Sequence, residues 1–247
     1  MRYMIDTIMF DLDGTLIQYS QESFIGTYFP ELKKVFIKLG LDPDVSISAV
    51  LAGIKAMVLN DGSVLNTHTF WQTFAESMRI SSEMLALVEA ACDSFYTSDF
   101  GKVRTIVKQN DISKQLVRKM AEKGYTVVLA TNPMFPLCAV ETRLGWIGLE
   151  LNDFELVTYY ANSSFCKPNP DYFHEVLMKI GKTPEQCFMA GNHPVEDMAA
   201  QKLGIEVFLV TDFLENDSGT DISAFRKGSL AELEAYLAAF PDILPEK

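Results

Sequence analysis

Hydrophobic positions along the chain follow two patterns that predict different elements. Apolar runs of strand length occur at residues 4–10, 125–130, 154–160, 187–191 and 205–210. Runs that are apolar on both faces are typical of parallel strands buried between layers of helices. Helical spacing separates them from residue 101 onward, as in Phe173, Val176, Leu177 and Ile180. We therefore predict an α/β fold with a doubly wound, mostly parallel sheet, that is, a Rossmann-like core.

Residues 17–100 show helical spacing alone. Helices are expected over 24–39, 43–59, 67–78 and 82–96, with Gly and Asn-Asp-Gly breaks between some of them. An all-helical block that follows the first strand of an α/β core predicts an inserted second domain. We expect residues 1–16 and 101–247 to form the core and residues 17–100 to form the smaller domain.

Composition and charge narrow the choice of partners. The 247 residues are 48% hydrophobic, which is enough to bury a core, and the formal net charge is −12. Such a field repels nucleic acid and anionic membranes, and no Lys/Arg cluster offsets it. It repels phosphorylated metabolites as well, unless cations or backbone N–H groups concentrate at one place.

Cysteine usage and the N-terminal residues indicate a compartment. The four cysteines form no CxxC pair and have no His at ligand spacing, which favours a reduced, cytoplasmic protein without structural zinc. Asp6, Asp11 and Asp13 argue against a signal peptide. No apolar run approaches the ~20 residues of a membrane span.

Asp11 and Asp13 are the sharpest chemical feature of the sequence. They belong to the stretch DLDGTL, residues 11–16, directly after the first predicted strand. Ligands of open α/β sheets bind beyond the carboxyl ends of the strands, so both side chains are expected in a site. Two carboxylates one residue apart can share a hard cation and still divide the roles of nucleophile and proton shuttle.

Three more strand ends carry polar residues. Thr131 and Asn132 follow the strand at 125–130 and offer a hydroxyl and an amide. Lys167 lies in the stretch KPNP after the next strand, and an acidic protein needs such a cation wherever it binds an anion. The fourth strand runs into GNHPVED, residues 191–197, which contains Asn192 and Asp197.

These four stretches, in this order, resemble the haloacid dehalogenase superfamily of hydrolases, and the resemblance covers the predicted core. It implies that Asp11 forms an aspartyl-phosphate and that Asp13 protonates the leaving oxygen and then activates water. It also implies that Thr131 and Lys167 hold the phosphoryl group, with Asn132 beside them. The helical insertion stands where this family has a cap that selects the substrate.

The resemblance further implies a Mg²⁺ site at Asp11, Asp13 (through its main-chain carbonyl), Asn192 and Asp197, with Glu196 as a possible aid. Asn192, however, stands where the family pattern has Asp. The lost Coulomb term beside a dication is roughly 8 kcal/mol at ~4 Å and an effective dielectric of ~20, before desolvation is subtracted. The expected function is a Mg²⁺-dependent phosphatase acting on a small phosphorylated metabolite.

Alternative functions remain open at this stage. Asn in the fourth stretch also occurs in the metal-independent dehalogenases of the superfamily, but that branch lacks an acid corresponding to Asp13. A phosphosugar mutase shares the nucleophile, and a catalytically silent member that binds a ligand or a partner is the rival from another class. Gln18, Tyr19 and Ser20 are candidates for substrate contact, whereas His68 is expected to be an exposed helical residue. The sequence identifies neither the substrate nor the oligomeric state.

Overall fold

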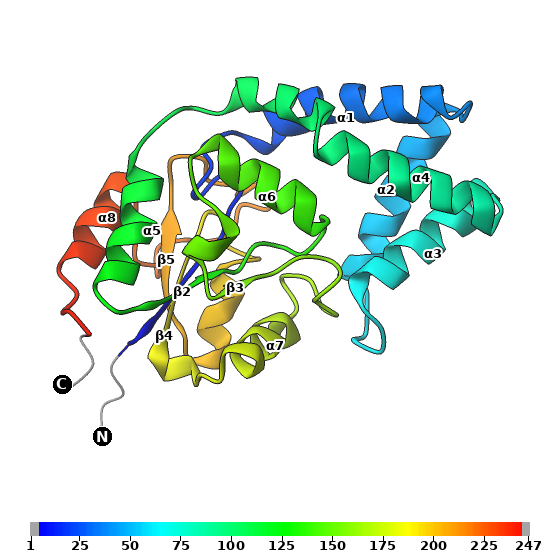
Figure 1. Ribbon diagram of the computed structural model, residues 1–247. Coiled ribbons are helices and arrows are strands. Elements are labelled where there is room, and N and C mark those ends of the chain that lie inside the picture. Colours follow the sequence, from blue (N-terminus) through cyan, green and yellow to red (C-terminus); the bar gives the residue numbers. More distant parts are fainter. Residues whose placement is uncertain (1–4, 244–247) are drawn as a thin grey trace.

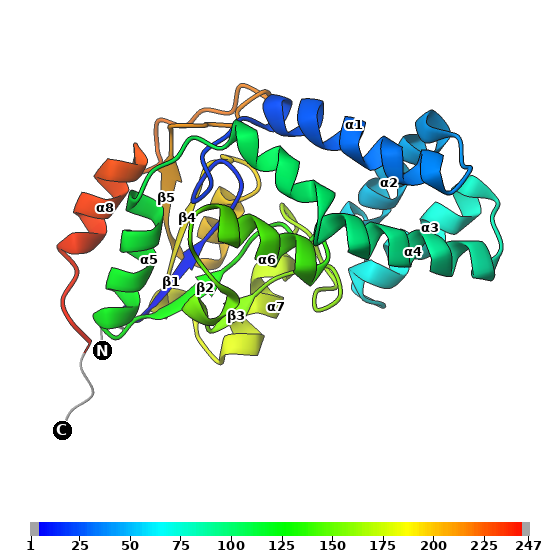
Figure 2. The same cartoon turned by 45° about the horizontal axis from the view of Figure 1, so that its top comes forward.

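The structure is a computed structural model that describes residues 5–243. A sheet with helices on both faces forms one end of the molecule, and four helices extend to the other end (Figures 1 and 2). All neighbouring strands are parallel, in the order β3-β2-β1-β4-β5-β6. The predicted fold class is confirmed. The strands are β1 (Thr7–Phe10), β2 (Thr126–Leu129), β3 (Leu156–Val157), β4 (Cys187–Gly191), β5 (Glu206–Val210) and β6 (Lys227–Gly228).

Alternate residues of β1 face two separate layers of core. Ile8 and Phe10 belong to one buried cluster and Met9 to the other, as the two-residue period of a strand requires. The first cluster includes residues of α5 (Ile112–Glu122), α6 (Leu137–Trp146) and α8 (Leu230–Ala238). The second includes residues of α7 (Pro170–Ile180) and the 3₁₀ helix η4 (Met198–Leu203). Helices therefore cover both faces of the sheet.

The segment 17–100 is helical, as its spacing predicts. It contains α1 (Gln21–Lys38), α2 (Pro43–Val58), α3 (Asn66–Met78) and α4 (Ser82–Tyr96), followed by the 3₁₀ helix η1 (Asp99–Ile106). The side chains of Ser20, Asp42 and Ser81 accept backbone N–H bonds at the starts of α1, α2 and α4, which satisfies donors that a helix leaves unpaired. The assignment of this segment as a separate cap domain stays a prediction.

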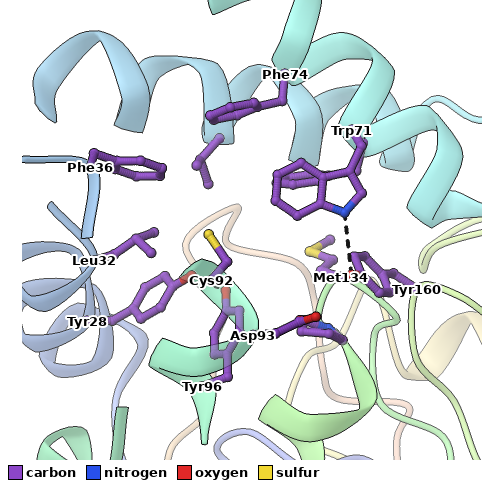
Figure 3. Close-up of a pocket in the computed structure, with 13 residues that line it drawn as sticks. Tyr28, Leu32, Phe36, Trp71, Phe74, Cys92, Asp93, Tyr96, Met134 and Tyr160 are labelled. Carbon is purple, nitrogen blue, oxygen red and sulfur yellow. Dashed lines mark hydrogen bonds between the residues drawn. The ribbon is translucent and has the colours of Figure 1, made fainter. Parts of the chain in front are cut away.

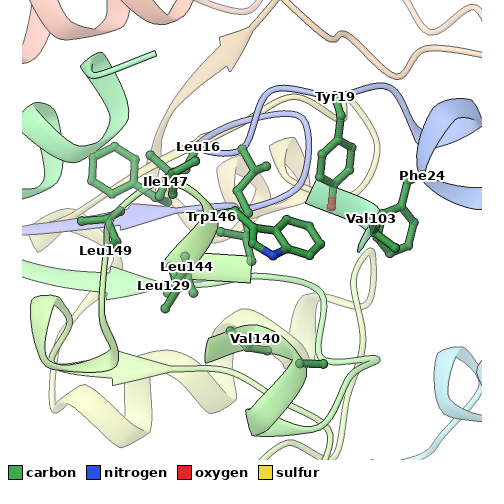
Figure 4. Packing of buried hydrophobic residues seen from close by; sticks show 14 of the residues in the cluster. Leu16, Tyr19, Phe24, Val103, Leu129, Val140, Leu144, Trp146, Ile147 and Leu149 are labelled. Atoms are coloured by element: carbon green, nitrogen blue, oxygen red, sulfur yellow. The ribbon is translucent and has the colours of Figure 1, made fainter. Parts of the chain in front are cut away.

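Aromatic packing anchors α1 to the α/β part. Phe24, in the first turn of α1, lies beside Val103, and Trp146 and Leu144 continue the same buried cluster toward the sheet (Figure 4). The ring of Phe100 packs edge-on against Phe24 and contacts Trp146 at a centroid distance of 5.1 Å. The N-terminal half of α1 is therefore held next to the strand ends.

Several elements differ from the sequence prediction. The strand expected at 4–10 is limited to Thr7–Phe10, with Met4 outside the described residues, and β6 was not predicted. Of residues 154–160 only Leu156–Val157 pairs as a strand, and at Thr158 the side-chain hydroxyl joins the backbone N–H in bonding to the end of β2 and the chain after it, with the Thr131 carbonyl at 2.7 Å. The helix expected after Asp197 is a short 3₁₀ helix. No helix within residues 5–243 is both long and apolar enough to cross a membrane.

Candidate active site

The carboxyl ends of three neighbouring strands bring the predicted residues together. Asp11 follows β1, Thr131 follows β2, and Asn192 follows β4. All three line one cleft, together with Asp13, Asn132 and Asp197. The order β2-β1-β4 explains this meeting, because parallel strands end at the same edge of the sheet.

Lys167 joins two of these carboxylates from below the cleft. Its side chain is fully buried, and its Nζ lies 2.9 Å from Asp11 Oδ1 and 2.6 Å from Asp197 Oδ1. Burial disfavours the ammonium ion, but the charges of Asp11 and Asp197 outweigh it and raise the pKa of Lys167 above its ordinary value. The lysine is thus a fixed positive charge at the base of the site.

Asn132 positions the loop that carries Lys167. Its Oδ1 accepts the backbone N–H of Lys167 at 3.2 Å, and its Nδ2 donates to the Glu196 carboxylate at 2.8 Å. The residue therefore cross-links the second, third and fourth polar stretches. Its amide is occupied by protein partners rather than directed at a ligand.

Excess negative charge surrounds Asp11. Burial raises the pKa of Asp11 well above its usual range, Lys167 opposes this, and the charges of Asp197 and Asp13 add to it. Burial, reinforced by Asp197, also raises the pKa of Glu196. In the same way burial, followed by the charges of Asp13 and Glu196, raises the pKa of Glu215 to about 7. The site holds more carboxylates than its own cations neutralise.

Asp13 is held by an arginine that the sequence analysis did not single out. Arg143 of α6 is fully buried, and its Nη1 donates to Asp13 Oδ2 at 2.5 Å. The Tyr19 hydroxyl donates to the other carboxylate oxygen. The guanidinium lies over the Phe135 ring at 4.3 Å, and its Nη2 has no hydrogen-bond partner among the described residues. Asp13 itself keeps 34% of its side chain exposed.

The side chain of Asn192 makes two hydrogen bonds to described residues. Its Nδ2 donates to the Phe213 carbonyl at 2.7 Å, and its Oδ1 accepts the Thr15 hydroxyl at 3.3 Å. A carbonyl oxygen only accepts, so the Phe213 contact fixes which end of the amide faces it. The amide also packs on Gly14, where a Cβ atom would lie 2.1 Å from Nδ2. Oδ1 is the atom of Asn192 with a lone pair left for a cation.

The site opens into a cleft of about 590 Å³ beneath α1 and α2. This volume lies in the range of small-molecule sites. Within residues 5–243, no three His, Cys, Asp or Glu side chains are grouped to hold a metal ion. The surplus negative charge nevertheless fits a divalent cation, because six carboxylates line the cleft and Lys167 and Arg143 are the only described cations that pair with any of them. The six are Asp11, Asp13, Glu196, Asp197, Glu215 and Asp217.

Comparison with protein families identifies the chain. Residues 5–204 match the family described as haloacid dehalogenase-like hydrolase. The chain belongs to this hydrolase family. The match includes all four polar stretches and the helical segment between the first two, so the resemblance noted in the sequence is confirmed. A search of curated protein sequences gives no match.

Solved structures share the fold of this haloacid dehalogenase-like hydrolase. One is a haloacid dehalogenase phosphatase from Thermococcus onnurineus, with 18% identity and TM-score 0.59, covering 97% of this chain and 100% of that one. Another is a 2-haloacid dehalogenase from Pseudomonas syringae, with 20% identity, TM-score 0.62 and coverages of 95% and 99%. A third, a family enzyme from Bacteroides thetaiotaomicron in complex with magnesium and inorganic phosphate, has 18% identity, TM-score 0.53 and coverages of 88% and 100%.

The sequence did not indicate Arg143, Glu215 or Asp217 as residues of this site. Arg143 follows Ala139 and Val140 at helical spacing. A charged residue on an otherwise apolar, core-facing stripe was the one sequence signal that could have indicated Arg143. Glu215 lies in a segment that reads as an ordinary polar loop, with no signal of its own. Of the three candidates for substrate contact, only Tyr19 lines the cleft. His68 is exposed, as expected.

Proposed function

We propose that the chain is a Mg²⁺-dependent phosphatase that hydrolyses a small phosphorylated metabolite through an aspartyl-phosphate. The observation that carries the proposal is the pairing of Asp11, fixed by Lys167, with a second acid, Asp13, whose side chain reaches the same cleft. An alkoxide leaving group needs a proton, whereas a halide does not. Asp13 is the group that supplies it.

In the proposed reaction an Asp11 oxygen attacks phosphorus while protonated Asp13 gives its proton to the departing ester oxygen. The P–O bond to the alcohol breaks as the Asp11–P bond forms. Asp13, now ionised, takes a proton from water, whose oxygen attacks phosphorus and releases phosphate and Asp11. Arg143 and Tyr19 hold Asp13 in place, and each of its oxygens keeps a second lone pair for this exchange.

Phosphoryl transfer depends on positioning and on neutralising charge on the three transferred oxygens. Lys167 and Thr131 are the residues proposed to contact that group, with Asn132 holding the Lys167 loop. Asp11, Asp197, the Asp13 carbonyl and Asn192 Oδ1 are the proposed ligands of Mg²⁺, which would neutralise both the phosphoryl oxygens and the surplus carboxylates. Mg²⁺ prefers oxygen ligands and retains waters, so few protein ligands are needed.

The test is Mg²⁺-dependent phosphate release from p-nitrophenyl phosphate and a panel of phosphorylated metabolites. Asp11→Asn should abolish release, and Asp171→Asn, which changes an exposed carboxylate on α7, should leave it intact. Wild-type turnover in Asp11→Asn would remove the nucleophile assignment. Thermal unfolding of each variant shows that the fold is retained.

One observation favours a second candidate, a metal-independent dehalogenase. Asn192 turns its amide nitrogen to Phe213, and Lys167 already bridges Asp11 and Asp197. Halide release from 2-haloacids in the presence of a chelator would establish it. If the wild-type protein shows neither phosphatase nor dehalogenase activity, the catalytically silent alternative, a protein that binds a ligand or a partner, is favoured instead.

A further inference from the structure

The cleft has two chemically distinct sides. The carboxylates lie on segments of the α/β part, whereas α1, α2 and the loop after β2 contribute mostly apolar side chains. Because the reacting carboxylates lie at the strand ends, the part of a substrate that points away from them meets the apolar side. The apolar residues are Phe24, Ile25, Tyr28, Phe29, Leu51, Ile54, Met134 and Phe135.

A series of stacked rings begins at the acid that faces the leaving group. Tyr19, whose hydroxyl contacts Asp13, stacks on Phe24 with ring centroids 5.3 Å apart, and Phe24 stacks on Tyr28 at 5.2 Å. Phe135 packs edge-on against Phe24 at 6.1 Å. The wall of the cleft beside Asp13 is therefore built from packed aromatic rings.

Three large apolar side chains around the cleft are exposed to solvent. Ile25 on α1 is 42% exposed, Leu51 on α2 is 49% exposed, and Val195 after β4 is 38% exposed. All three line the same cleft, from both of its sides. Exposed apolar residues scattered singly need no explanation, but a group around one cleft marks a binding surface.

Among residues 5–243, no arginine or lysine lines the cleft. Lys167 and Arg143 lie beneath it and are already paired with Asp11, Asp197 and Asp13. The polar side chains of the lining away from the four strand-end stretches are few, chiefly Gln21 and Ser218, and His193 lies beside the carboxylates. A second anionic group on the substrate would therefore meet mainly carboxylates or hydrocarbon, which leave it uncompensated. The lining thus selects against substrates with a carboxylate or a second phosphate.

We propose that the substrate is a phosphate monoester of an apolar, ring-bearing alcohol that has no second anionic group. This inference rests on the proposed phosphatase function. The phosphoryl group occupies the strand ends, and the ring lies between Phe135 and the exposed side chain of Leu51.

A smaller cavity behind Tyr28 does not take the ring. Its volume is about 30 Å³, and it lies among Leu32, Phe36, Trp71 and Tyr160 (Figure 3). Such a volume holds about one or two waters. Tyr28 and Met134 line both cavities and separate them, so the ring binds on the open side of Tyr28.

The test compares three phosphate esters whose leaving groups are all alkoxides, so that differences report binding. They are benzyl phosphate, glycerol 3-phosphate and phosphoglycolate, assayed with Mg²⁺. Burial of a ring gives an expected kcat/KM advantage for benzyl phosphate of at least ~10-fold over each of the others. Equal or faster turnover of glycerol 3-phosphate or phosphoglycolate would overturn the inference and leave the phosphatase proposal standing.

Leu51→Lys places a cation in the cleft and provides a second arm. The ratio of kcat/KM for phosphoglycolate to that for benzyl phosphate should rise at least ~10-fold. Leu87→Lys adds the same charge on α4, outside the cleft, at a residue 56% exposed, and should leave this ratio unchanged. The same ratio in both variants would show that Leu51 does not face the substrate.

Phosphonate binding separates the two proposals. Benzylphosphonate, methylphosphonate and phosphonoacetate cannot be hydrolysed at the P–C bond, and calorimetry measures their binding to the wild-type protein with Mg²⁺. The inference expects benzylphosphonate to bind most tightly. If it does and no ester is turned over, the phosphatase proposal fails while the preference of the cleft stands; if phosphonoacetate binds most tightly, the preference itself is wrong.

Discussion

The substitution Asn192→Asp places one more carboxylate in the site, and the structure gives it two opposing effects. In the wild type, Asn192 Nδ2 donates to the Phe213 carbonyl at 2.7 Å. An aspartate of the same shape has an acceptor at that atom, so two oxygens face each other without a proton between them. The second effect concerns the cation proposed to bind at Asp11 and Asp197, which an added charge would attract.

Both magnitudes follow from this geometry. Loss of a buried hydrogen bond that leaves its acceptor unpaired costs about 1–3 kcal/mol, and in a protein of this size that lowers Tm by roughly 2–12 °C. The gross attraction of a carboxylate to a dication at ~4 Å is roughly 8 kcal/mol at an effective dielectric of ~20. Desolvation offsets most of it, yet a net ~1.4 kcal/mol already changes the affinity tenfold.

We therefore expect Asn192→Asp to unfold at a lower temperature than the wild type with a chelator present. With Mg²⁺ it should need at least ~10-fold less of the ion for half-maximal phosphatase activity. Thermal unfolding in a chelator and activity against Mg²⁺ concentration measure the two effects. Asn192→Ala, which removes both hydrogen bonds and adds no charge, is the control: it should lose stability without gaining Mg²⁺ affinity.

Each effect has its own refutation. An Asn192→Asp protein as stable as the wild type without metal would mean that the contact with Phe213 does not fix residue 192. An unchanged Mg²⁺ requirement would mean that residue 192 is not close to the ion. Turnover in the variant and none in the wild type would support the catalytically silent alternative.

Three further substitutions test the surroundings of the site. Arg143→Met should cost about 1–3 kcal/mol of unfolding free energy, less than a fully buried pair because Asp13 is partly exposed, and should slow alkyl phosphates more than p-nitrophenyl phosphate; equal losses would argue against a role through Asp13. Burial raises the pKa of Glu215 to about 7. The protonated side chain therefore stabilises the folded state fully at a pH below the pKa of Glu215 in the unfolded chain, and this contribution is lost as the pH rises through about 7. Relative to Glu215→Gln, the wild type should thus lose about 1–2 kcal/mol between about pH 5 and 8, after discounting for partial exposure; parallel stability curves would contradict this. Gly14→Ala should abolish activity and lower Tm, because φ is +76° and a Cβ would strike Asn192; a wild-type Tm would show that the turn adapts.

The sequence predicted well those features that repeat along the chain. Apolar runs identify buried strands, helical spacing identifies α1 to α4, and polar residues that follow strands identify Asp11, Lys167 and Asp197. All of this depends on local pattern and on the rule that parallel strands end at one edge. The family match over residues 5–204 spans all of these stretches.

Periodicity does not say which distant side chains meet. Arg143 contacts Asp13 across 130 positions, and Glu215 reaches the site from a loop with no regular pattern. For Asn192, the sequence shows the lost charge but not the Phe213 carbonyl that orients the amide. These contacts depend on how α6 and the loop after β5 pack, which only the tertiary structure shows.

The distribution of charge explains why the motifs do not identify the substrate. In the proposed function, the strand-end stretches supply the carboxylates and Lys167, which would act in the same way on the phosphoryl group of every ester. The parts that differ between esters would meet α1 and α2, where side chains such as Ile25 and Leu51 follow no motif and remain exposed. Apolar residues on the core-facing side of a helix are buried when the protein folds, whereas Ile25 and Leu51 are not. Apolar residues of these helices that folding leaves uncovered beside the reacting carboxylates are therefore the residues from which the specificity of this hydrolase is to be read.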